Sequence, residues 1–115
     1  MSSSTPTGDD PRSGVLTESR PELEHTTPRM WRVLLHNDDF TTQEFVVWVL
    51  ETVFRKAAAD AFEIMLHVHR AGIGVAGLYT KEIAETKVTA TERVAEQHEF
   101  PLRVSMEPEP EEAKR

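Results

Sequence analysis

The chain has 115 residues and a mass of 13.0 kDa, which allows one domain but not two of ordinary size. Its formal net charge of -7 would repel phosphate backbones and anionic lipid, so we expect neither nucleic acid nor a membrane surface as a partner. The absence of cysteine excludes disulfide bonds and thiolate metal sites.

The sequence predicts neither a secretory signal nor a membrane span. Residues 1–8 have no basic start and no apolar run. The longest apolar run, residues 45–50, is far shorter than the about 20 residues that a spanning helix needs. We therefore expect a cytoplasmic protein. Its acidic balance suits a cationic ligand, such as an amine.

The two ends of the chain are polar. Residues 1–28 consist mainly of Ser, Thr, Pro, Gly, Asp and Glu, and residues 108–115 combine acidic residues with proline. Such segments cannot bury enough apolar surface to offset the entropy lost on ordering. We predict a disordered N-terminal extension over residues 1–28, an ordered core over residues 29–107 and a disordered acidic tail over residues 108–115.

The core begins with a predicted strand over residues 30–35. Trp31, Val33 and Leu35 fall on one side of it and Arg32 on the other. This period of two is expected of a half-buried strand.

A polar corner separates this strand from the first helix. Asn-Asp-Asp at residues 37–39 favours a turn, because these short side chains bond nearby backbone amides. Thr41 and Glu44 have the spacing of a capping box, which predicts a helix over residues 42–56. Such a corner is either a solvated turn or a source of acceptors that local structure does not use.

Apolar residues at helical spacing predict a second helix over residues 60–71. Gly72 follows the last of them, at the place where a left-handed cap ends a helix.

The next run, residues 73–79, is too short and too rich in glycine for a helix and predicts a second strand. We expect Ile73, Val75 and Tyr79 on one side of this strand. Gly77 interrupts that side and is expected to mark a bulge or a close backbone approach.

A third helix is predicted from a cap at Thr80 to about His98, with Glu82 in its first turn, where a negative charge suits the helix dipole. The 3.6-residue period places four residues on one stripe: Val88, Thr91, Val94 and Ala95. Pro101 blocks continuation, and alternation over residues 102–106 predicts a third strand.

The order of elements is therefore strand, helix, helix, strand, helix, strand. Three strands cannot hide both faces from water alone, so we predict a two-layer α+β domain in which a three-stranded antiparallel sheet packs against three helices. The glycines match neither nucleotide-binding fingerprint.

The second helix contains the pair His67 and His69. Two helical residues turn the chain by about 200°, so the rings point to opposite sides and do not share one metal ion. We expect no metal and no cofactor. Judged from the helix alone, His69 shares a face with Met65 and is interpreted as a partly buried packing residue.

The helices after the corner could instead bring His69 close to Asn37 and Asp38. A neutral imidazole nitrogen, an amide oxygen and a carboxylate are all acceptors. Three acceptors directed at one point suit a donor with three hydrogens and a positive charge. The α-amino group of a peptide, with a pKa of about 7.7 to 8.0, meets both conditions at neutral pH. A lysine ammonium also qualifies.

Four segments occur in a characteristic order: residues 37–41 (Asn-Asp-Asp-Phe-Thr), 65–69 (Met-Leu-His-Val-His), 80–88 (Thr-Lys-Glu-Ile-Ala-Glu-Thr-Lys-Val) and 101–102 (Pro-Leu). With their spacing, they resemble the bacterial ClpS adaptor family over about residues 30–106. The resemblance implies an adaptor, not an enzyme, that recognises N-degrons, meaning proteins whose exposed first residue is Leu, Phe, Tyr or Trp. The adaptor would deliver them to a Clp AAA+ unfoldase of ClpA or ClpC type and its protease for degradation.

The resemblance also implies roles by matching position. Asn37, Asp38 and His69 would hold the substrate α-amino group, and Glu82 and Lys87 would face the N-terminal domain of the unfoldase. The side-chain pocket would be lined or shaped by Leu35, Asp39, Thr41, Gln43, Val46, Met65, Val68 and Leu102. The N-terminal extension would take part in delivery, and we expect a monomer.

Two positions depart from the family pattern. Gln43 stands where the family commonly has a methionine that gates the pocket, and its amide places a polar group at an apolar lip. We expect weaker or altered selectivity among Leu, Phe, Tyr and Trp. Thr42 replaces the proline often found at the start of this helix, which is compatible with a cap.

Two other classes remain open from the residues alone. A small hydrolase could use Asp38 or Asp39 with His69 as acid and base, although no serine or cysteine nucleophile accompanies them in a known motif. An interaction domain like the C-terminal domain of the ribosomal stalk protein has a similar order of elements, but it has no use for the polar corner.

Overall fold

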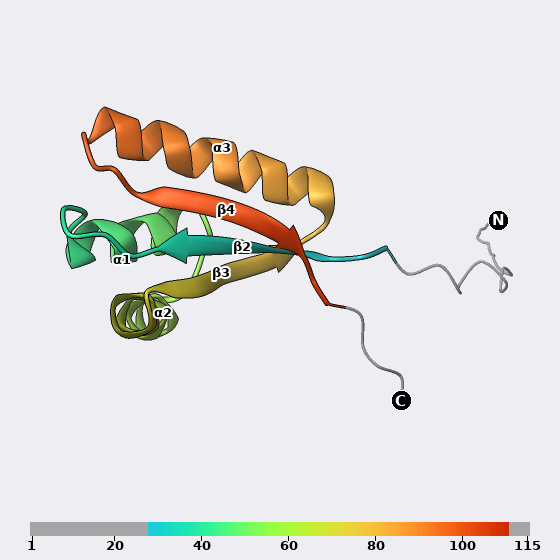
Figure 1. Cartoon of the computed structure of the whole chain (residues 1–115), viewed down its shortest axis with the longest axis horizontal. Coiled ribbons are helices and arrows are strands. Elements are labelled where there is room, and N and C mark those ends of the chain that lie inside the picture. Colours follow the sequence, from blue (N-terminus) through green and yellow to red (C-terminus); the bar gives the residue numbers. More distant parts are fainter. Residues whose placement is uncertain (1–27, 111–115) are drawn as a thin grey trace, which may run out of the picture.

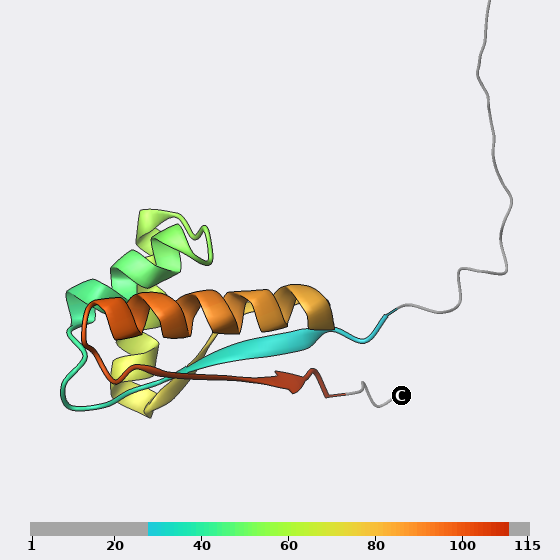
Figure 2. The same cartoon turned by 90° about the horizontal axis from the view of Figure 1, so that it is seen from above.

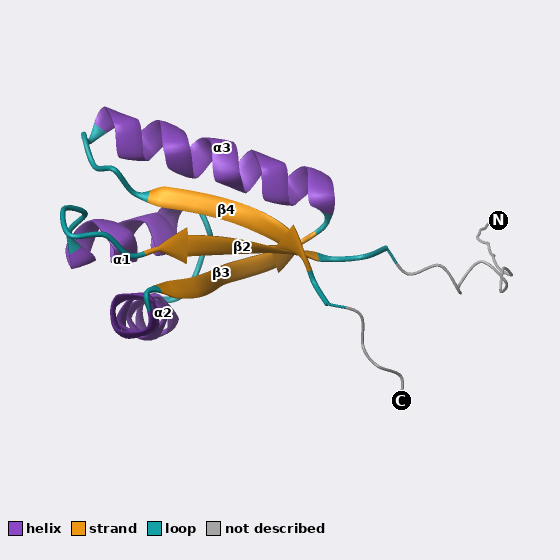
Figure 3. Cartoon of the chain, viewed as in Figure 1, coloured by secondary structure: helices purple, strands orange, loops and turns teal. Residues whose placement is uncertain are grey.

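The computed structural model describes residues 28–110, so the predicted disordered tails lie outside the described residues, apart from residue 28 and residues 108–110. Six elements follow along the chain (Figures 1 and 3). They are β2 (Trp31–His36), α1 (Gln43–Thr52), α2 (Ala58–Ala71), β3 (Ile73–Tyr79), α3 (Lys81–Gln97) and β4 (Arg103–Pro108).

The sheet has the strand order β3-β2-β4, and both neighbours run antiparallel to the central strand β2. Figure 2 shows α1 and α3 on the same side of the sheet. The helix α2 packs beside β3, and α3 packs beside β4. The predicted two-layer α+β fold, with a three-stranded antiparallel sheet and three helices, is confirmed.

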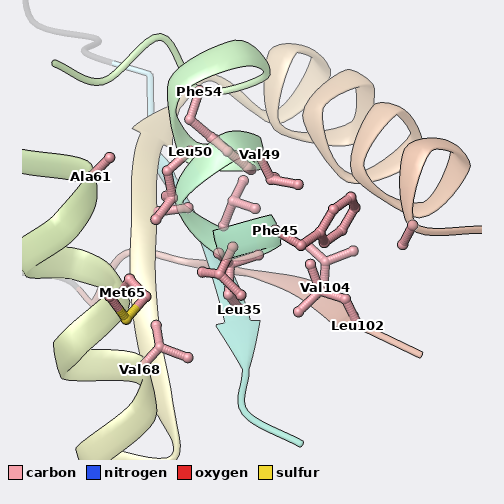
Figure 4. Close-up of a cluster of buried hydrophobic side chains, with 14 of the residues drawn as sticks. Leu35, Phe45, Val49, Leu50, Phe54, Ala61, Met65, Val68, Leu102 and Val104 are labelled. Atoms are coloured by element: carbon pink, nitrogen blue, oxygen red, sulfur yellow. The ribbon is translucent and has the colours of Figure 1, made fainter. Parts of the chain in front are cut away.

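The core lies between the sheet and the helices (Figure 4). Val33 and Leu35 of β2 are fully buried in it, and Trp31 packs at its edge, as the alternation predicts. On the opposite face of the sheet, Arg32 of β2 forms an ion pair with Glu107 of β4. Burial of each large apolar side chain contributes about 1.5 to 3 kcal/mol, so the inner face holds the layers together.

The first helix differs from its prediction at both ends. Thr42 is the N-cap, and its side-chain oxygen accepts a hydrogen bond from a first-turn amide at 3.1 Å. The predicted capping box of Thr41 and Glu44 is therefore wrong. The helix ends at Thr52 and not near residue 56, and Arg55 then takes a left-handed backbone conformation (φ 57°) that cannot continue a helix.

The second helix ends as predicted. Gly72 takes the left-handed conformation (φ 90°), and its backbone N–H donates to the carbonyl of Val68. The helix starts at Ala58, two residues before the predicted start, and Ala57 at its N-cap has no side-chain oxygen to cap it.

The strand β3 contains a bulge next to Gly77, where an irregularity was predicted. Its pairing with β2 skips Ala76, which shifts the alternation of side chains by one. Ile73 and Val75 are consequently exposed, whereas Tyr79 is half-buried against the core. The expectation that these three residues share one side is wrong for this reason.

The third helix begins after Thr80, as predicted, but the Thr80 side chain makes no capping hydrogen bond. Its inner stripe is buried or half-buried, as expected: Val88, Thr91, Val94 and Ala95. Thr91 satisfies its hydroxyl by donating to the carbonyl of Lys87 at 2.8 Å.

The last strand is longer than predicted. It runs to Pro108, and the backbone N–H of Glu109 donates to the carbonyl of Met30 at 2.7 Å. A proline is tolerated here because β4 is an edge strand. The ordered domain therefore extends past the predicted boundary at residue 107.

Candidate functional site

A pocket of about 360 Å³ lies where β2 ends, between the corner (residues 37–42), the start of α1 and the last turns of α2. It is lined by Asn37, Asp38, Asp39, Phe40, Thr41, Thr42, Gln43, Val46, Met65, Val68 and His69. Residues from two helices and a loop thus face one space. By contrast, a hollow of about 330 Å³ along α3 is lined by that helix alone.

The pocket includes the three residues predicted to bind the amine and most of those predicted for the side-chain pocket. Leu35 and Leu102 do not line it; both are buried in the core cluster that also contains the lining residues Val46, Met65 and Val68. Phe40 and Thr42 line it without having been predicted. Both residues belong to the corner, and this position in the sequence could have predicted that they line the pocket.

One backbone hydrogen bond explains why the corner and α2 meet. The N–H of Asn37 donates to the carbonyl of Gly72 at 2.9 Å. Gly72 caps α2, and His69 lies in the last turn of that helix. The bond therefore holds the end of β2 against the end of α2 and brings His69 to the same pocket as Asn37 and Asp38.

Asp38 is fixed by its own turn. One carboxylate oxygen accepts from the backbone N–H of Phe40 at 2.8 Å and of Thr41 at 2.7 Å, and the other accepts from the Thr41 hydroxyl at 2.7 Å. Of the two interpretations of the corner, spare acceptors apply to Asp38 only in part, because local structure uses three of its acceptor positions. An ionised carboxylate offers about four acceptor positions, so one remains for a ligand.

These hydrogen bonds also set the charge of Asp38. Partial burial raises the pKa of this carboxyl, but the bonds from the Thr41 hydroxyl, the Thr41 amide and the Phe40 amide together outweigh burial. The pKa of Asp38 consequently lies below its ordinary value, so a negative charge is held at the pocket at neutral pH.

Asn37 and His69 differ from Asp38 because their side chains are exposed. Within residues 28–110, no hydrogen bond to another side chain or to the backbone occupies either of them. The expected partial burial of His69 is therefore wrong, and its imidazole stays available. No group of three or more His, Asp or Glu residues in this described range is placed to hold a metal ion.

One wall of the pocket is apolar. Val46, Met65 and Val68 contribute to it and are only 7%, 4% and 2% exposed. In Figure 4, Met65 and Val68 extend from α2 toward the sheet. Gln43, the first residue of α1, also lines the pocket and is exposed.

The hydroxyl groups in the pocket are already engaged. The Thr41 hydroxyl donates to Asp38, and the Thr42 oxygen accepts from the Phe45 amide. Thr41 is paired with the Asp38 carboxylate, but the lowered pKa of that carboxyl makes it a weak base, and the Thr42 oxygen serves as the helix cap. The pocket therefore suits binding of a cation joined to an apolar group, not hydrolysis.

The two residues predicted to face an unfoldase lie on α3, away from the pocket. Glu82 is exposed in the first turn and borders the α3 hollow. Lys87 is half-buried, its Nζ donates to the carbonyl of Val53 at 2.7 Å, and it lies 5.6 Å from the ring centroid of Tyr79. Much of the bonding capacity of Lys87 is thus used within the domain.

Fold and pocket together define a small α+β domain of the ligand-binding class. Residues 26–105 match the family described as ATP-dependent Clp protease adaptor protein ClpS. The chain belongs to the ClpS family.

Relatives and a solved structure agree with this assignment. The chain is 54% identical over 97 residues to the ATP-dependent Clp protease adapter protein ClpS of Myxococcus xanthus, covering 84% of this chain and 91% of the relative. It is 56% identical over 95 residues to that of Desulfatibacillum aliphaticivorans, covering 83% and 89%. The structure of Agrobacterium tumefaciens ClpS2 bound to L-phenylalaninamide superposes with a TM-score of 0.69 at 37% identity, covering 72% of this chain and all of that one.

The protein is thus an adaptor of an ATP-dependent Clp protease, and the prediction that it is not an enzyme is confirmed by the names of its relatives. This assignment replaces both the hydrolase and the ribosomal-stalk alternatives. None of the helices within residues 28–110 is long and apolar enough to cross a bilayer.

Proposed function

We propose that this adaptor recognises N-degrons, binding a free α-amino group through Asn37, Asp38 and His69 and a bulky apolar first side chain in the adjoining pocket. The observation that supports this most is the fixed, ionised Asp38 carboxylate. It faces the same pocket as an apolar wall and as Asn37 and His69, whose side chains make no hydrogen bond to any other described residue. L-phenylalaninamide, the ligand of the Agrobacterium relative, likewise combines an amino group with an apolar side chain.

The expected strength of binding suits a reversible carrier. Charge-assisted hydrogen bonds to an ammonium contribute about 1.5 to 3 kcal/mol each, and burial of one Leu or Phe side chain contributes about as much again. After the cost of association, a micromolar Kd is expected. The adaptor can then release its cargo to the protease.

Selectivity for the first residue depends on the rim in this proposal. Asp39, Thr41 and Gln43 line the pocket, and Leu35 and Leu102 belong to the core cluster that contains the apolar lining residues. Because the Gln43 amide loses water when an apolar side chain passes it, discrimination among Leu, Phe, Tyr and Trp is weakened. Gln43→Met should change the order or spread of affinities for peptides that differ only in these first residues. Unchanged affinities in fluorescence anisotropy would exclude this role.

Delivery involves a Clp AAA+ unfoldase of ClpA or ClpC type. We assign the contact with its N-terminal domain to α3, where Glu82 is exposed, with Lys87 as a second contact. The segment before residue 29 takes part in delivery, and the adaptor acts as a monomer.

A pair of peptides tests the proposal. A peptide that begins with Phe should bind with a micromolar Kd, and the same peptide acetylated at its N-terminus should bind at least about tenfold more weakly, because acetylation removes the positive charge. Isothermal titration calorimetry measures both affinities. Equal binding of the two peptides would refute recognition of the α-amino group.

A further inference from the structure

Phe40 has an unusually exposed ring. It is 75% exposed, whereas the other exposed large apolar side chains of the described residues, such as Phe62 at 52% and Trp48 at 41%, are more covered. A single exposed apolar residue needs no explanation by itself. Phe40, however, also lines the pocket, next to the residues assigned to the amine.

The position of Phe40 is tied to the amine-binding carboxylate. Its backbone N–H donates to Asp38 at 2.8 Å, and the neighbouring Thr41 amide donates to the same oxygen. The turn that holds the Asp38 carboxylate in place therefore also holds the backbone from which the Phe40 side chain extends. A ligand whose amino group meets Asp38 therefore has this residue close by.

A bound N-terminal residue leaves one direction for the rest of its peptide. Its amino group is held by Asn37, Asp38 and His69, and its side chain lies against the buried apolar wall. The carbonyl and the second residue must then leave through the mouth. The exposed side chains lining the pocket are Asn37, Asp39, Phe40, Thr42, Gln43 and His69, and Phe40 alone among them is wholly apolar.

We propose that the Phe40 ring packs against the side chain of the second residue of the bound peptide and makes the adaptor prefer an apolar residue there. This inference rests on the proposed function. Removal of about 40 Å² of apolar surface from water corresponds to roughly a fivefold gain in affinity. The second residue thereby becomes part of the recognised signal.

Three ligands separate this effect from recognition of the first residue. L-phenylalaninamide has no second side chain, and two otherwise identical peptides begin with Phe-Leu and Phe-Gly. The native protein should bind the Phe-Leu peptide about fivefold more tightly than the Phe-Gly peptide. In Phe40→Ala this ratio should fall below about twofold, and affinity for the Phe-Leu peptide should fall more than affinity for L-phenylalaninamide. Phe40→Leu, which keeps an apolar side chain, should retain most of the ratio.

Phe62→Ala is the matched control, because Phe62 is also an exposed phenylalanine but does not line the pocket. It should leave all three affinities unchanged. A native ratio near one, or a ratio that survives in Phe40→Ala, would overturn the inference while leaving the proposed function intact. An equal loss of all three ligands in Phe40→Ala would also overturn it, by showing that Phe40 shapes the pocket itself. If none of the ligands binds the native protein, the proposed function fails as well.

Discussion

The corner and α3 hold their charged residues in different ways. At the corner, the bonds that Asp38 accepts keep it ionised and facing the pocket. Beside it, the side chains of Asn37 and His69 make no hydrogen bond within the part of the chain that the structure describes. On α3, Glu82 is exposed, but Lys87 donates to the end of α1. Internal hydrogen bonds therefore preorganise Asp38 for binding at the corner, whereas on α3 they use Lys87 to stabilise the fold.

The largest effect should come from Asp38→Asn, which keeps the shape of the side chain and removes its charge. Loss of one charge-assisted bond to the amine costs about 1.5 to 3 kcal/mol, so affinity for a peptide beginning with Phe should fall about 10- to 150-fold. Titration calorimetry provides the measurement. Asp60→Asn, on an exposed acid in the first turn of α2, is the control and should bind normally. Native affinity in Asp38→Asn would remove this residue from the amine site.

Lys87→Met tests, through thermal stability, whether Lys87 on α3 helps to hold the fold together. Lys87 donates to Val53, the C-cap residue of α1, whose last turn has no basic residue of its own. Loss of this bond should destabilise the domain by about 1 to 2 kcal/mol, which lowers Tm by about 4 to 8 °C per kcal/mol in a domain of this size.

Glu82→Gln is the matched variant on the same helix. It should leave Tm unchanged within about 1 °C, because Glu82 is exposed and contributes little to stability. Since we assign Glu82 to the contact with the unfoldase, binding to the isolated N-terminal domain of the unfoldase should weaken. Thermal unfolding followed by circular dichroism compares the two variants. Equal Tm values for Lys87→Met and the native protein would show that the Val53 bond does not stabilise α1.

A smaller effect is expected from Thr41→Val, which removes one of the three donors to Asp38 and keeps the volume of the side chain. A carboxylate that is held less firmly should bind the amine about 2- to 13-fold more weakly, since one hydrogen bond contributes about 0.5 to 1.5 kcal/mol. Anisotropy with a labelled peptide can resolve this change. Thr86→Val, on the exposed side of α3, should leave peptide affinity unchanged.

The smallest effect concerns pH. The pKa of Asp38 is lowered in the folded protein, because its hydrogen bonds outweigh partial burial. The carboxylate therefore contributes stability that is fully present above the unfolded pKa of about 3.9 and is lost as pH falls through the lower folded value. The difference in Tm between the native protein and Asp38→Asn should be constant from pH 7 to about pH 5 and shrink toward pH 3. A difference that grows in acid would contradict this assignment.

The sequence predicted the elements that depend on local pattern. Alternation located β2, and Gly72 marked the end of α2 because few other residues adopt its left-handed conformation. Thr41 and Thr42 could not be separated by pattern, because both are good caps and the choice depends on the bonds that Asp38 accepts. Thr41 donates to Asp38, which leaves the cap to Thr42.

Other features depend on contacts between distant segments. The bulge at Ala76 is defined by pairing with β2. The pattern of residues within β3 alone could therefore not predict that Tyr79 packs against the core while Ile73 and Val75 are exposed. The bond from Lys87 to Val53 joins residues 34 positions apart. For the pocket, the resemblance supplied residue positions, whereas the bond from Asn37 to Gly72 provides the physical reason that they meet.

The central position of β2 also determines how the domain responds to mechanical load. The chain enters β2 directly from residue 28, and β2 is bonded to β3 on one side and to β4 on the other. Tension applied from the N-terminal side acts along this strand and shears both ladders together, so their hydrogen bonds share the force. Tension along β4, an edge strand, is resisted by one ladder only. For a pull along the strand axis we therefore expect the domain to resist more force on β2 than on β4.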